Sequence, residues 1–417
     1  MLKVVEKHYD EYVEFTKKLV SLKSLPCDEK DCAEYILSEL QKLPIDEAFI
    51  DGCGNVVGVI RGTGEGPNIL LNGHIDVVPE GTTEKWLPFK PYEPEIVDGY
   101  FYGRGIADMK AGVAATFWGF KAVADYLAET GKKLSGDLIY SGVVQEEPAE
   151  MFGMKYFMEK TMPEHNLSVD FVYVAEPTNG DIKIGQRGKI ELVCKTYGKS
   201  VHSSAPHFGV NALQHMNPVI QAIFDGDGIN LDPDPYLGNT CITITNIGVK
   251  PGGNLSTVPD YCEIAIDRRY STAMSEEDLL GEFHAIFDKV KEKYPDFEGT
   301  IEPRYFEETS WTGYTEKVKK WHPAWRIERD NEFVVKTFEA LEGIGQSPKE
   351  AYAVGGTDCS MSCAIHGIPS VLYCNAAEQT CHREQECIKL SELIDAYEGY
   401  VAILAKVYDI DLAEFDK

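Results

Sequence analysis

The fold class is clearest in the stretch Ile69-Leu70-Leu71-Asn72-Gly73-His74-Ile75-Asp76. It begins as a short apolar run of the kind found in buried strands, and polar side chains follow directly. Similar apolar runs recur along the chain, and segments with helical periodicity separate them. Strands that alternate with helices indicate an α/β protein with a mostly parallel sheet covered on both faces. Because ligands bind beyond the carboxyl ends of such strands, the residues just after each strand are the candidates for function.

The elements of this α/β pattern can be placed by residue range. Apolar runs predict strands over 56–60, 69–71, 138–144, 171–175 and 369–372. Helical periodicity predicts two helices before residue 43 and further helices over 112–129, 152–159, 332–342 and 391–408. A glycine-rich segment, 62–66, joins the first two strands. It lacks the lysine and the following helix of a phosphate loop, so a hairpin turn is expected there.

From about residue 187 the pattern of the sequence changes. Strands are predicted over 189–197, 241–247 and 261–267, and helices over 211–224 and 275–293. Two strand–helix–strand passes suggest a compact inserted α+β domain. The chain has 417 residues, more than the roughly 250–300 residues at which single cores stop growing. We therefore expect a discontinuous first domain, 1–186 and 306–417, with a second domain over 187–305.

Composition and charge exclude several classes of function. The 40 Lys and Arg against 68 Asp and Glu give a net charge of −28, which repels nucleic acids and anionic membranes. The charged N-terminal segment does not resemble a signal peptide, and no apolar run reaches the ~18 residues that a membrane span needs. The 11 scattered cysteines fit a reduced, cytoplasmic protein.

The first candidate site follows the strand at 69–71. In an extended segment, His74 and Asp76 share one face, so the carboxylate can accept a hydrogen bond from the imidazole or lie close behind it. A histidine that binds a metal is fixed in one tautomer in this way. A histidine and an aspartate in a surface loop are the alternative interpretation.

Two further candidate sites carry carboxylates. Asp108 lies at the predicted start of a helix, where it could bind a ligand or cap the helix. Glu146 and Glu147 follow the strand at 138–144, and adjacent carboxylates repel each other unless a cation or hydrogen-bond donors compensate. A general base beside a metal ligand would explain the pair, and a solvated loop is the alternative.

Glu176 follows the strand at 171–175, and His382 comes late in the chain. Together the candidates offer nitrogen and oxygen ligands that suit zinc, with carboxylates that can bridge two ions: His74, Asp108, Glu147, Glu176 and His382. Each signal is weak alone, but their combination predicts a metal centre.

The order of these motifs resembles the M20 metallopeptidase family, which includes acetylornithine deacetylase, succinyl-diaminopimelate desuccinylase, aminoacylase and glutamate carboxypeptidase. The resemblance starts in Asn72-Gly73-His74-Ile75-Asp76-Val77-Val78-Pro79 and Tyr102-Gly103-Arg104-Gly105 through Asp108-Met109-Lys110. It continues through Glu146-Glu147, Ala175-Glu176-Pro177, Gly355-Gly356-Thr357-Asp358 and His382, and so covers nearly the whole chain. It implies a zinc-peptidase-like sheet flanked by helices, with an inserted lid that is also the usual dimerisation domain.

The resemblance also implies roles for the candidate residues. His74 and Glu176 would hold one zinc ion, Glu147 and His382 the other, and Asp108 would bridge the two. Asp76 would orient His74. Glu146 would be the general base, which takes a proton from the attacking water and returns it to the leaving amine. Cobalt or manganese could replace zinc at carboxylate-rich sites.

Substrate contacts are implied in the lid and beside the pocket. His202 matches the histidine that stabilises the oxyanion, often from the partner subunit. Recognition of a carboxylate favours the fork-shaped donors of arginine, and the candidates by resemblance are Arg187 and either Arg268 or Arg269, of which we predict Arg268. Further expected contacts are Asn254, Gly356 and Thr357. Cys381 stands where the family often has alanine, and a Cys381–His382 nucleophilic pair is disfavoured because adjacent extended residues point apart.

The predicted function is hydrolysis of the amide bond of an N-acyl amino acid or a related small carboxylate. A dipeptidase or carboxypeptidase on the same scaffold is the close alternative. A non-catalytic binding protein would be expected to lack one ligand or the base, yet all of these residues are present. The predicted partners are a small substrate with a free carboxylate and a second copy of the chain, bound through the lid.

Overall fold

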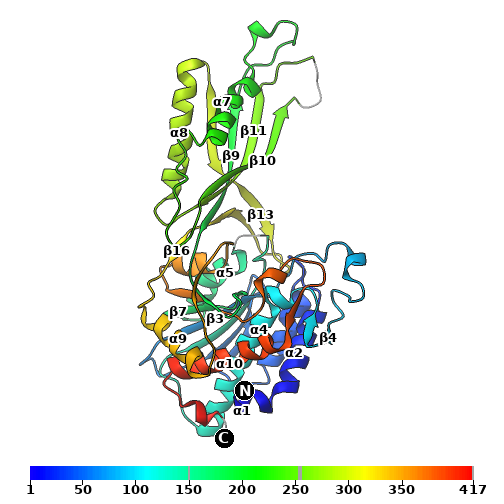
Figure 1. Cartoon of the computed structure of the whole chain (residues 1–417), viewed down its shortest axis with the longest axis vertical. Helices are drawn as coiled ribbons and strands as arrows, with labels where there is room; N and C mark the ends of the chain where they lie inside the picture. Colours follow the sequence, from blue (N-terminus) through cyan, green and yellow to red (C-terminus); the bar gives the residue numbers. More distant parts are fainter. Residues whose placement is uncertain (149–150, 252–255, 416–417) are drawn as a thin grey trace.

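The computed structural model describes residues 1–148, 151–251 and 256–415. In Figure 1 the chain forms a broad lower body, which holds both termini, and a narrower upper body. Each body has its own hydrophobic core. The lower core draws residues from Val4 to Tyr408, and the upper core draws residues from Ile190 to Ile301.

The lower body is built around a nine-stranded sheet. The strand order is β1-β2-β6-β3-β7-β18-β8-β16, with β17 also paired to β8. The central strands β6, β3, β7 and β18 run parallel, and antiparallel pairs lie toward both edges. The strands are β1 (Glu47–Ile50), β2 (Val56–Ile60), β3 (Ile69–His74), β6 (Leu138–Val143), β7 (Phe171–Val174), β8 (Ile182–Gln186), β16 (Trp325–Arg326), β17 (Glu350–Ala353) and β18 (Ser370–Leu372).

Every residue of β2, β3, β6 and β7 is buried. Because side chains alternate between the two faces of a strand, both faces of the central sheet are covered, as their uninterrupted apolar runs predict. The α/β class and the parallel centre of the sheet are therefore confirmed.

The expected hairpin at 62–66 is wrong. Strands β2 and β3 do not pair with each other, because β6 lies between them, antiparallel to β2 and parallel to β3. The glycines allow a different close approach: a Cβ at Gly62 would lie 2.3 Å from the carbonyl oxygen of Gly136, just before β6. The segment therefore passes the end of β6, the strand that lies between β2 and β3.

Helices pack on this sheet and on one another. Helix α4 contacts β3 and β6, α10 contacts α4 and α9, and α3 contacts β1 and β2. The helices of the lower body are α1 (Lys3–Lys7), α2 (Tyr9–Ser21), α3 (Lys30–Leu40), α4 (Ala111–Thr130), α5 (Phe152–Tyr156), α6 (Met162–Glu164), α9 (Glu332–Gly343) and α10 (Leu390–Val407). Shorter 3-10 and π turns are η1 (Thr83–Trp86), η2 (Ile106–Lys110), η3 (Phe157–Thr161), η5 (Ser360–Ile365), η6 (Glu378–Thr380) and η7 (Leu412–Glu414). A three-stranded sheet completes this body, with β4 (Glu95–Val97), β5 (Tyr100–Tyr102) and β19 (Cys387–Lys389).

The upper body is a five-stranded antiparallel sheet with two long helices on it (Figure 1). Its strands are β9 (Gly188–Tyr197), β10 (Cys241–Lys250), β11 (Tyr261–Tyr270), β12 (Glu298–Pro303) and β15 (Trp321–His322), and its helices are α7 (Ala212–Asp225) and α8 (Glu276–Lys293), with the 3-10 turn η4 (Pro206–Phe208). Ser275 and Asp278 form a capping box at the start of α8. The domain boundary at residue 305 stays a prediction, and β15 pairs with β9 beyond it.

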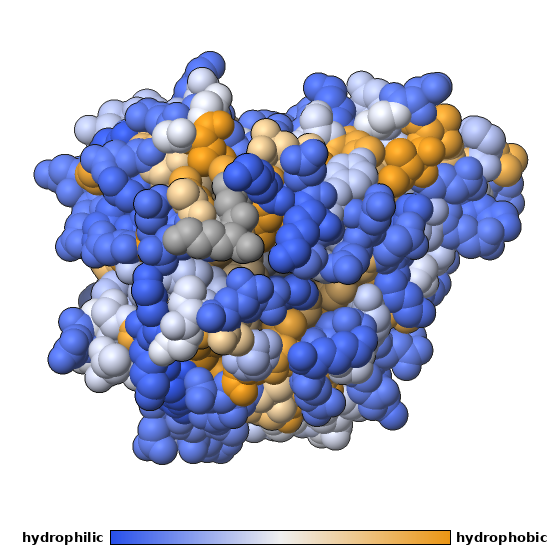
Figure 2. Space-filling model, turned by 90° about the horizontal axis from the view of Figure 1, so that it is seen from below, coloured by the Kyte–Doolittle hydropathy of each residue, from blue (hydrophilic) through white to orange (hydrophobic). Residues whose placement is uncertain are grey.

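Between the two bodies lies a two-stranded ribbon, β13 (Tyr305–Thr309) and β14 (Thr315–Lys319), drawn in yellow in Figure 1. Seen from below, the lower body presents mostly hydrophilic residues with hydrophobic ones between them (Figure 2). Within the described parts of the chain, no helix has both the length and the apolar character to cross a membrane.

Candidate metal centre

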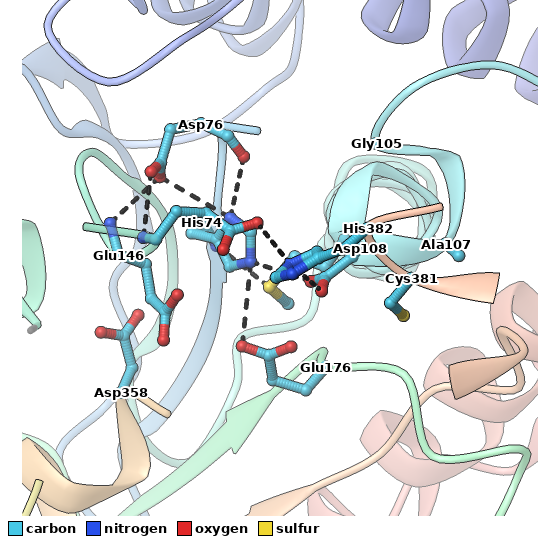
Figure 3. A network of polar contacts seen from close by, with 12 residues as sticks. His74, Asp76, Gly105, Ala107, Asp108, Glu146, Glu176, Asp358, Cys381 and His382 are labelled. Atoms are coloured by element: carbon cyan, nitrogen blue, oxygen red, sulfur yellow. Dashed lines mark hydrogen bonds and ion pairs between the residues drawn. The ribbon is translucent and has the colours of Figure 1, made fainter. Parts of the chain in front are cut away.

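Five elements bring acid and imidazole side chains together at one edge of the large sheet (Figure 3). His74 ends β3, Glu146 and Glu147 follow β6, and Glu176 follows β7. Asp108 lies in η2, before α4, and His382 follows η6. These side chains meet because the carboxyl ends of parallel strands lie at the same edge of a sheet.

A glycine allows the start of α4 to reach this edge. A Cβ at Gly112 would lie 2.0 Å from the carbonyl oxygen of Ala175, the residue before Glu176. Any larger residue would push the helix away from β7, and Asp108 would move away from Glu176 with it. The glycine therefore belongs to the architecture of the site.

Asp108 lies between the two imidazoles. Its Oδ1 is 3.2 Å from Nε2 of His74, and its Oδ2 is 3.2 Å from Nε2 of His382. The same nitrogen of His382 is 3.1 Å from Oε1 of Glu147, and Nε2 of His74 is 3.8 Å from Oε1 of Glu176. The carboxylate thus faces both histidines rather than capping the helix.

The donor set fits metal ions. Ligand atoms of His74, Asp108 and Glu147 lie within 4.8 Å of one another, and so do those of His74, Glu146 and Glu176. Two ligands at about 2.0–2.1 Å from one tetrahedral zinc ion are about 3.3 Å apart, close to the observed nitrogen–oxygen separations. Imidazole nitrogen with carboxylate oxygen is a donor set that zinc accepts.

The pKa shifts within the cluster also indicate a site for cations. Burial raises the pKa of Glu146, and burial with the charge of Asp108 raises the pKa of Glu176 to about 8. Hydrogen bonds to Asp108 and Glu147 raise the pKa of His382 to about 10. Protons are thus held where negative charge is crowded, and cations at the same place would remove the need for them.

Asp76 contacts His74 through its backbone, and its carboxylate lies close behind the imidazole, the second of the two arrangements that the sequence predicts. Nδ1 of His74 donates to the backbone carbonyl of Asp76 at 2.9 Å, and the nearer carboxylate oxygen is 3.6 Å away. The carboxylate instead accepts hydrogen bonds from the backbone N–H groups of Glu146 and Glu147, each at 3.1 Å. The backbone of Asp76 therefore fixes the His74 tautomer, and its side chain holds the loop that carries the two glutamates.

A pocket of about 240 Å³ opens beside the cluster. Its wall includes both predicted loop residues, Gly356 and Thr357, and the hydroxyl of Thr357 donates to Oε1 of Gln186 at 2.6 Å. Lys183, which no sequence motif indicates, also lines the pocket and pairs with Glu378 at 2.9 Å. These residues surround space next to the carboxylates.

The structure does not bring every predicted substrate residue to this pocket. His202 is exposed on the upper body, where its Nδ1 contacts the Ser204 hydroxyl. Arg187 lies at the junction of β8 and β9 and donates to the carbonyl of Asn239. Asn254 lies outside the described residues. Neither His202 nor Arg187 is among the residues that line the described pocket.

The prediction for Arg268 is wrong for this structure. Its side chain is fully buried in the upper body, where it donates to backbone carbonyls that include Cys241 and lies 3.4 Å from Glu282. A guanidinium held in this way is not available to a substrate. Strand alternation shows that Arg268 and Arg269 face opposite sides, but it does not show which side is covered.

Glu386 is a residue of this region that the sequence did not reveal. It is buried and accepts hydrogen bonds from the backbone N–H groups of Gly105, Ala107 and Asp108 at 3.0, 2.8 and 3.1 Å. It also pairs with Arg104 at 2.6 Å. One carboxylate thus fixes the loop that presents Asp108, but a glutamate four residues after His382 carries no signal of this role in the sequence.

Cys381 lines the pocket, and burial raises the pKa of its thiol. A thiol that keeps its proton is a poor nucleophile. This environment agrees with the low weight that the sequence gives to a Cys381–His382 nucleophilic pair.

Comparisons with known proteins agree with this geometry. The model of peptidase family M20/M25/M40 matches residues 70–406. The Escherichia coli (strain K12) protein YgeY is 29% identical over 408 residues, which are 96% of each chain. The succinyl-diaminopimelate desuccinylase of Nautilia profundicola is 30% identical over 315 residues, covering 74% of this chain and 80% of the relative.

Among solved structures, aminopeptidase PepT from Bacillus cereus ATCC 10987 has a TM-score of 0.69 at 22% identity, covering 95% of this chain and 98% of the other. At this identity the likeness concerns the fold. The family match extends over more than three-quarters of the sequence and contains every residue of the acid and imidazole cluster. The chain therefore belongs to peptidase family M20/M25/M40.

Proposed function

We propose that the protein is a dinuclear zinc-type amidohydrolase that cleaves the amide bond of an N-acyl amino acid or a related small carboxylate. The observation that carries the proposal is the placement of Asp108, with one oxygen toward His74 and the other toward His382. This is the arrangement that a carboxylate needs to bridge two ions.

The proposal divides the five ligands between two ions. His74 and Glu176 would hold one ion, Glu147 and His382 would hold the other, and Asp108 would be shared by both. Bound zinc polarises a carbonyl and lowers the pKa of water toward about 7. Cobalt or manganese would serve the same donor set.

Glu146 is the proposed general base. It shares the loop of Glu147, and burial raises its pKa, which suits a group that must both take and return a proton near neutral pH. It accepts a proton from the attacking water and passes it to the nitrogen of the departing amine. The Asp76 carboxylate, through the backbone of Glu146 and Glu147, holds this base in place.

Two observations favour a small acylated substrate. The pocket of about 240 Å³ suits a small molecule, and the desuccinylases are relatives over most of the chain. A peptidase is the second candidate, because the solved structure of PepT, an aminopeptidase, shares the fold. We further propose that the active form is a homodimer through the upper body, which supplies His202 from the partner subunit.

The test is hydrolysis of a panel of N-acyl amino acids and dipeptides with zinc or cobalt, with Glu146→Ala as the control. Turnover of acylated amino acids by the wild type, and its loss in a variant that still binds two ions, would support the deacylase. Cleavage of free dipeptides alone would favour the peptidase. A metal-loaded wild type that hydrolyses neither class would contradict the proposal.

A further inference from the structure

The loop that carries the proposed base has a contact outside the metal cluster. Gln145 directly precedes Glu146, is fully buried and has a φ of 53°. Its Nε2 donates to the backbone carbonyl of Thr309 at 2.8 Å and contacts Sγ of Cys27 at 3.2 Å. Positive φ is uncommon for a residue other than glycine and persists where the surroundings fix it. Thr309 is the last residue of β13.

The tip of the β13–β14 ribbon is anchored in the lower body. The Trp311 side chain packs over Gly54, where a Cβ would lie 2.2 Å from Nε1 of the indole. The hydroxyl of Thr312 donates to the carbonyl of Gly52 at 2.7 Å. Trp311 and Tyr314 both pack against the lower core. The tip of the ribbon is thus packed into the surface of the lower body.

The base of the ribbon is anchored in the upper body. Lys319 pairs with Glu276, in the first turn of α8. Just beyond β14, Nε1 of Trp321 donates to the hydroxyl of Tyr270 at 2.6 Å, and β15 pairs with β9. The ribbon therefore connects the upper body to Gln145, the residue before the proposed base.

We propose that the β13–β14 ribbon is a strap that positions Glu146, with Gln145 and Trp311 as positioning residues. This inference rests on the proposed function of Glu146. The Asp76 carboxylate fixes the loop at Glu146 and Glu147, and the ribbon fixes it one residue earlier. A general base must lie within hydrogen-bond reach of the proton it removes, and a displacement of about 1 Å can lower the rate about a hundredfold.

The kinetic test compares four variants. Gln145→Leu keeps the volume and removes the donor to Thr309, and Trp311→Ala removes the anchor of the tip. Trp311→Phe keeps most of that packing, and Glu307→Gln changes an exposed residue of the same ribbon. For the first two we expect kcat to fall about ten- to a hundredfold, with KM within about twofold of the wild type and two zinc ions still bound. Trp311→Phe and Glu307→Gln should keep the wild-type kcat.

A merely structural ribbon would give another result. Gln145→Leu and Trp311→Ala would then have lower melting temperatures but the wild-type kcat below those temperatures, and the proposal would be overturned.

Hydrogen exchange gives a second readout that does not depend on any activity. Trp311→Ala should speed exchange of the amides of Glu146 and Glu147, which donate to Asp76, whereas Glu307→Gln should not. Unchanged exchange in folded Trp311→Ala would overturn the strap even if the wild type hydrolysed none of the substrates. Faster exchange with an inactive wild type would leave the strap in place and reject the proposed chemistry.

Discussion

Three carboxylates in the region of the site have different partners, although they lie close together. Asp108 faces two imidazoles, Asp76 accepts from the loop of Glu146 and Glu147, and Glu386 accepts from the loop of Asp108. Asp76 and Glu386 therefore hold backbone segments in place and are not proposed as metal ligands themselves. A substitution of either should act on metal binding or on the base indirectly, through the loop it holds.

Glu29 allows a prediction about the pH dependence of stability. Burial and the charge of Asp76 raise its pKa from 4.5 to about 8. Between these values the folded protein keeps a proton that the unfolded chain releases, so this residue lowers stability as the pH rises through that window. We expect Glu29→Gln to be more stable than the wild type by about 1–4 kcal/mol at pH 9, with a difference near zero at pH 4.5.

Urea unfolding of both proteins at several pH values, with a chelator present, measures this difference. Glu34→Gln is the control, because Glu34 is exposed and pairs with Lys30 at 3.7 Å across one helical turn. If the difference in unfolding free energy between Glu29→Gln and the wild type stayed constant from pH 4.5 to 9, the Glu29 side chain would not titrate in this window.

The sequence reveals residues that follow strands better than residues that act from elsewhere. The placement of His74, Glu147 and Glu176 after parallel strands made their meeting predictable. Glu386 and Gln145 gave no such signal, because their roles come from backbone groups far along the chain. Arg268 was misassigned because the covered face of its strand depends on the packing of α7 and α8.

The positions of the strands along the chain could be predicted from the sequence, but the order of the strands within the sheet could not. The apolar runs predicted β2, β6 and β7 within about a residue of their ends, whereas β3 extends three residues beyond its predicted end. The position of β6 between β2 and β3 depends on a segment more than sixty residues further along. Only tertiary packing decides such an order, and for this reason the glycine-rich segment looked like a hairpin.

The loop before α4, which presents Asp108, is held by the buried charge of Glu386. Glu386→Gln keeps the size of the side chain but removes the charge that faces Arg104 and three backbone N–H groups. The loop that presents Asp108 should become less ordered, and we expect zinc affinity to fall about 10- to 100-fold. Isothermal titration calorimetry of the chelator-treated protein measures this change.

Glu384→Gln is the matched control, since Glu384 lies two residues away and its partner, Lys85 at 3.3 Å, is exposed to solvent. Its zinc affinity should equal that of the wild type. Equal affinity in Glu386→Gln as well would mean that the loop keeps its shape without the buried charge.

At the scale of the whole molecule, the edge strand β10 of the upper body supports the proposed dimer. It pairs with β11 on one side, and its Ile247 and Val249 side chains are exposed. A long edge strand with exposed apolar residues is a template for pairing with another chain. We expect Ile247→Lys to convert a dimer to a monomer and to lower kcat, because His202 would then be missing from the neighbouring site.

Size-exclusion chromatography with light scattering measures the oligomeric state of the wild type and of Ile247→Lys. Ile365→Lys, a substitution of an exposed apolar residue on the lower body, should leave the dimer intact. A wild type that is monomeric at micromolar concentration would contradict the dimer, and His202 would then have to act within its own chain or not at all.

Zinc titration of the chelator-treated wild type by calorimetry measures whether this edge of the sheet holds two metal ions. We predict two ions per chain for the wild type and for Glu146→Ala, and a marked loss of binding for Asp108→Ala, which removes the shared ligand. A wild type that binds no zinc, or that binds it equally well without Asp108, would contradict the dinuclear site.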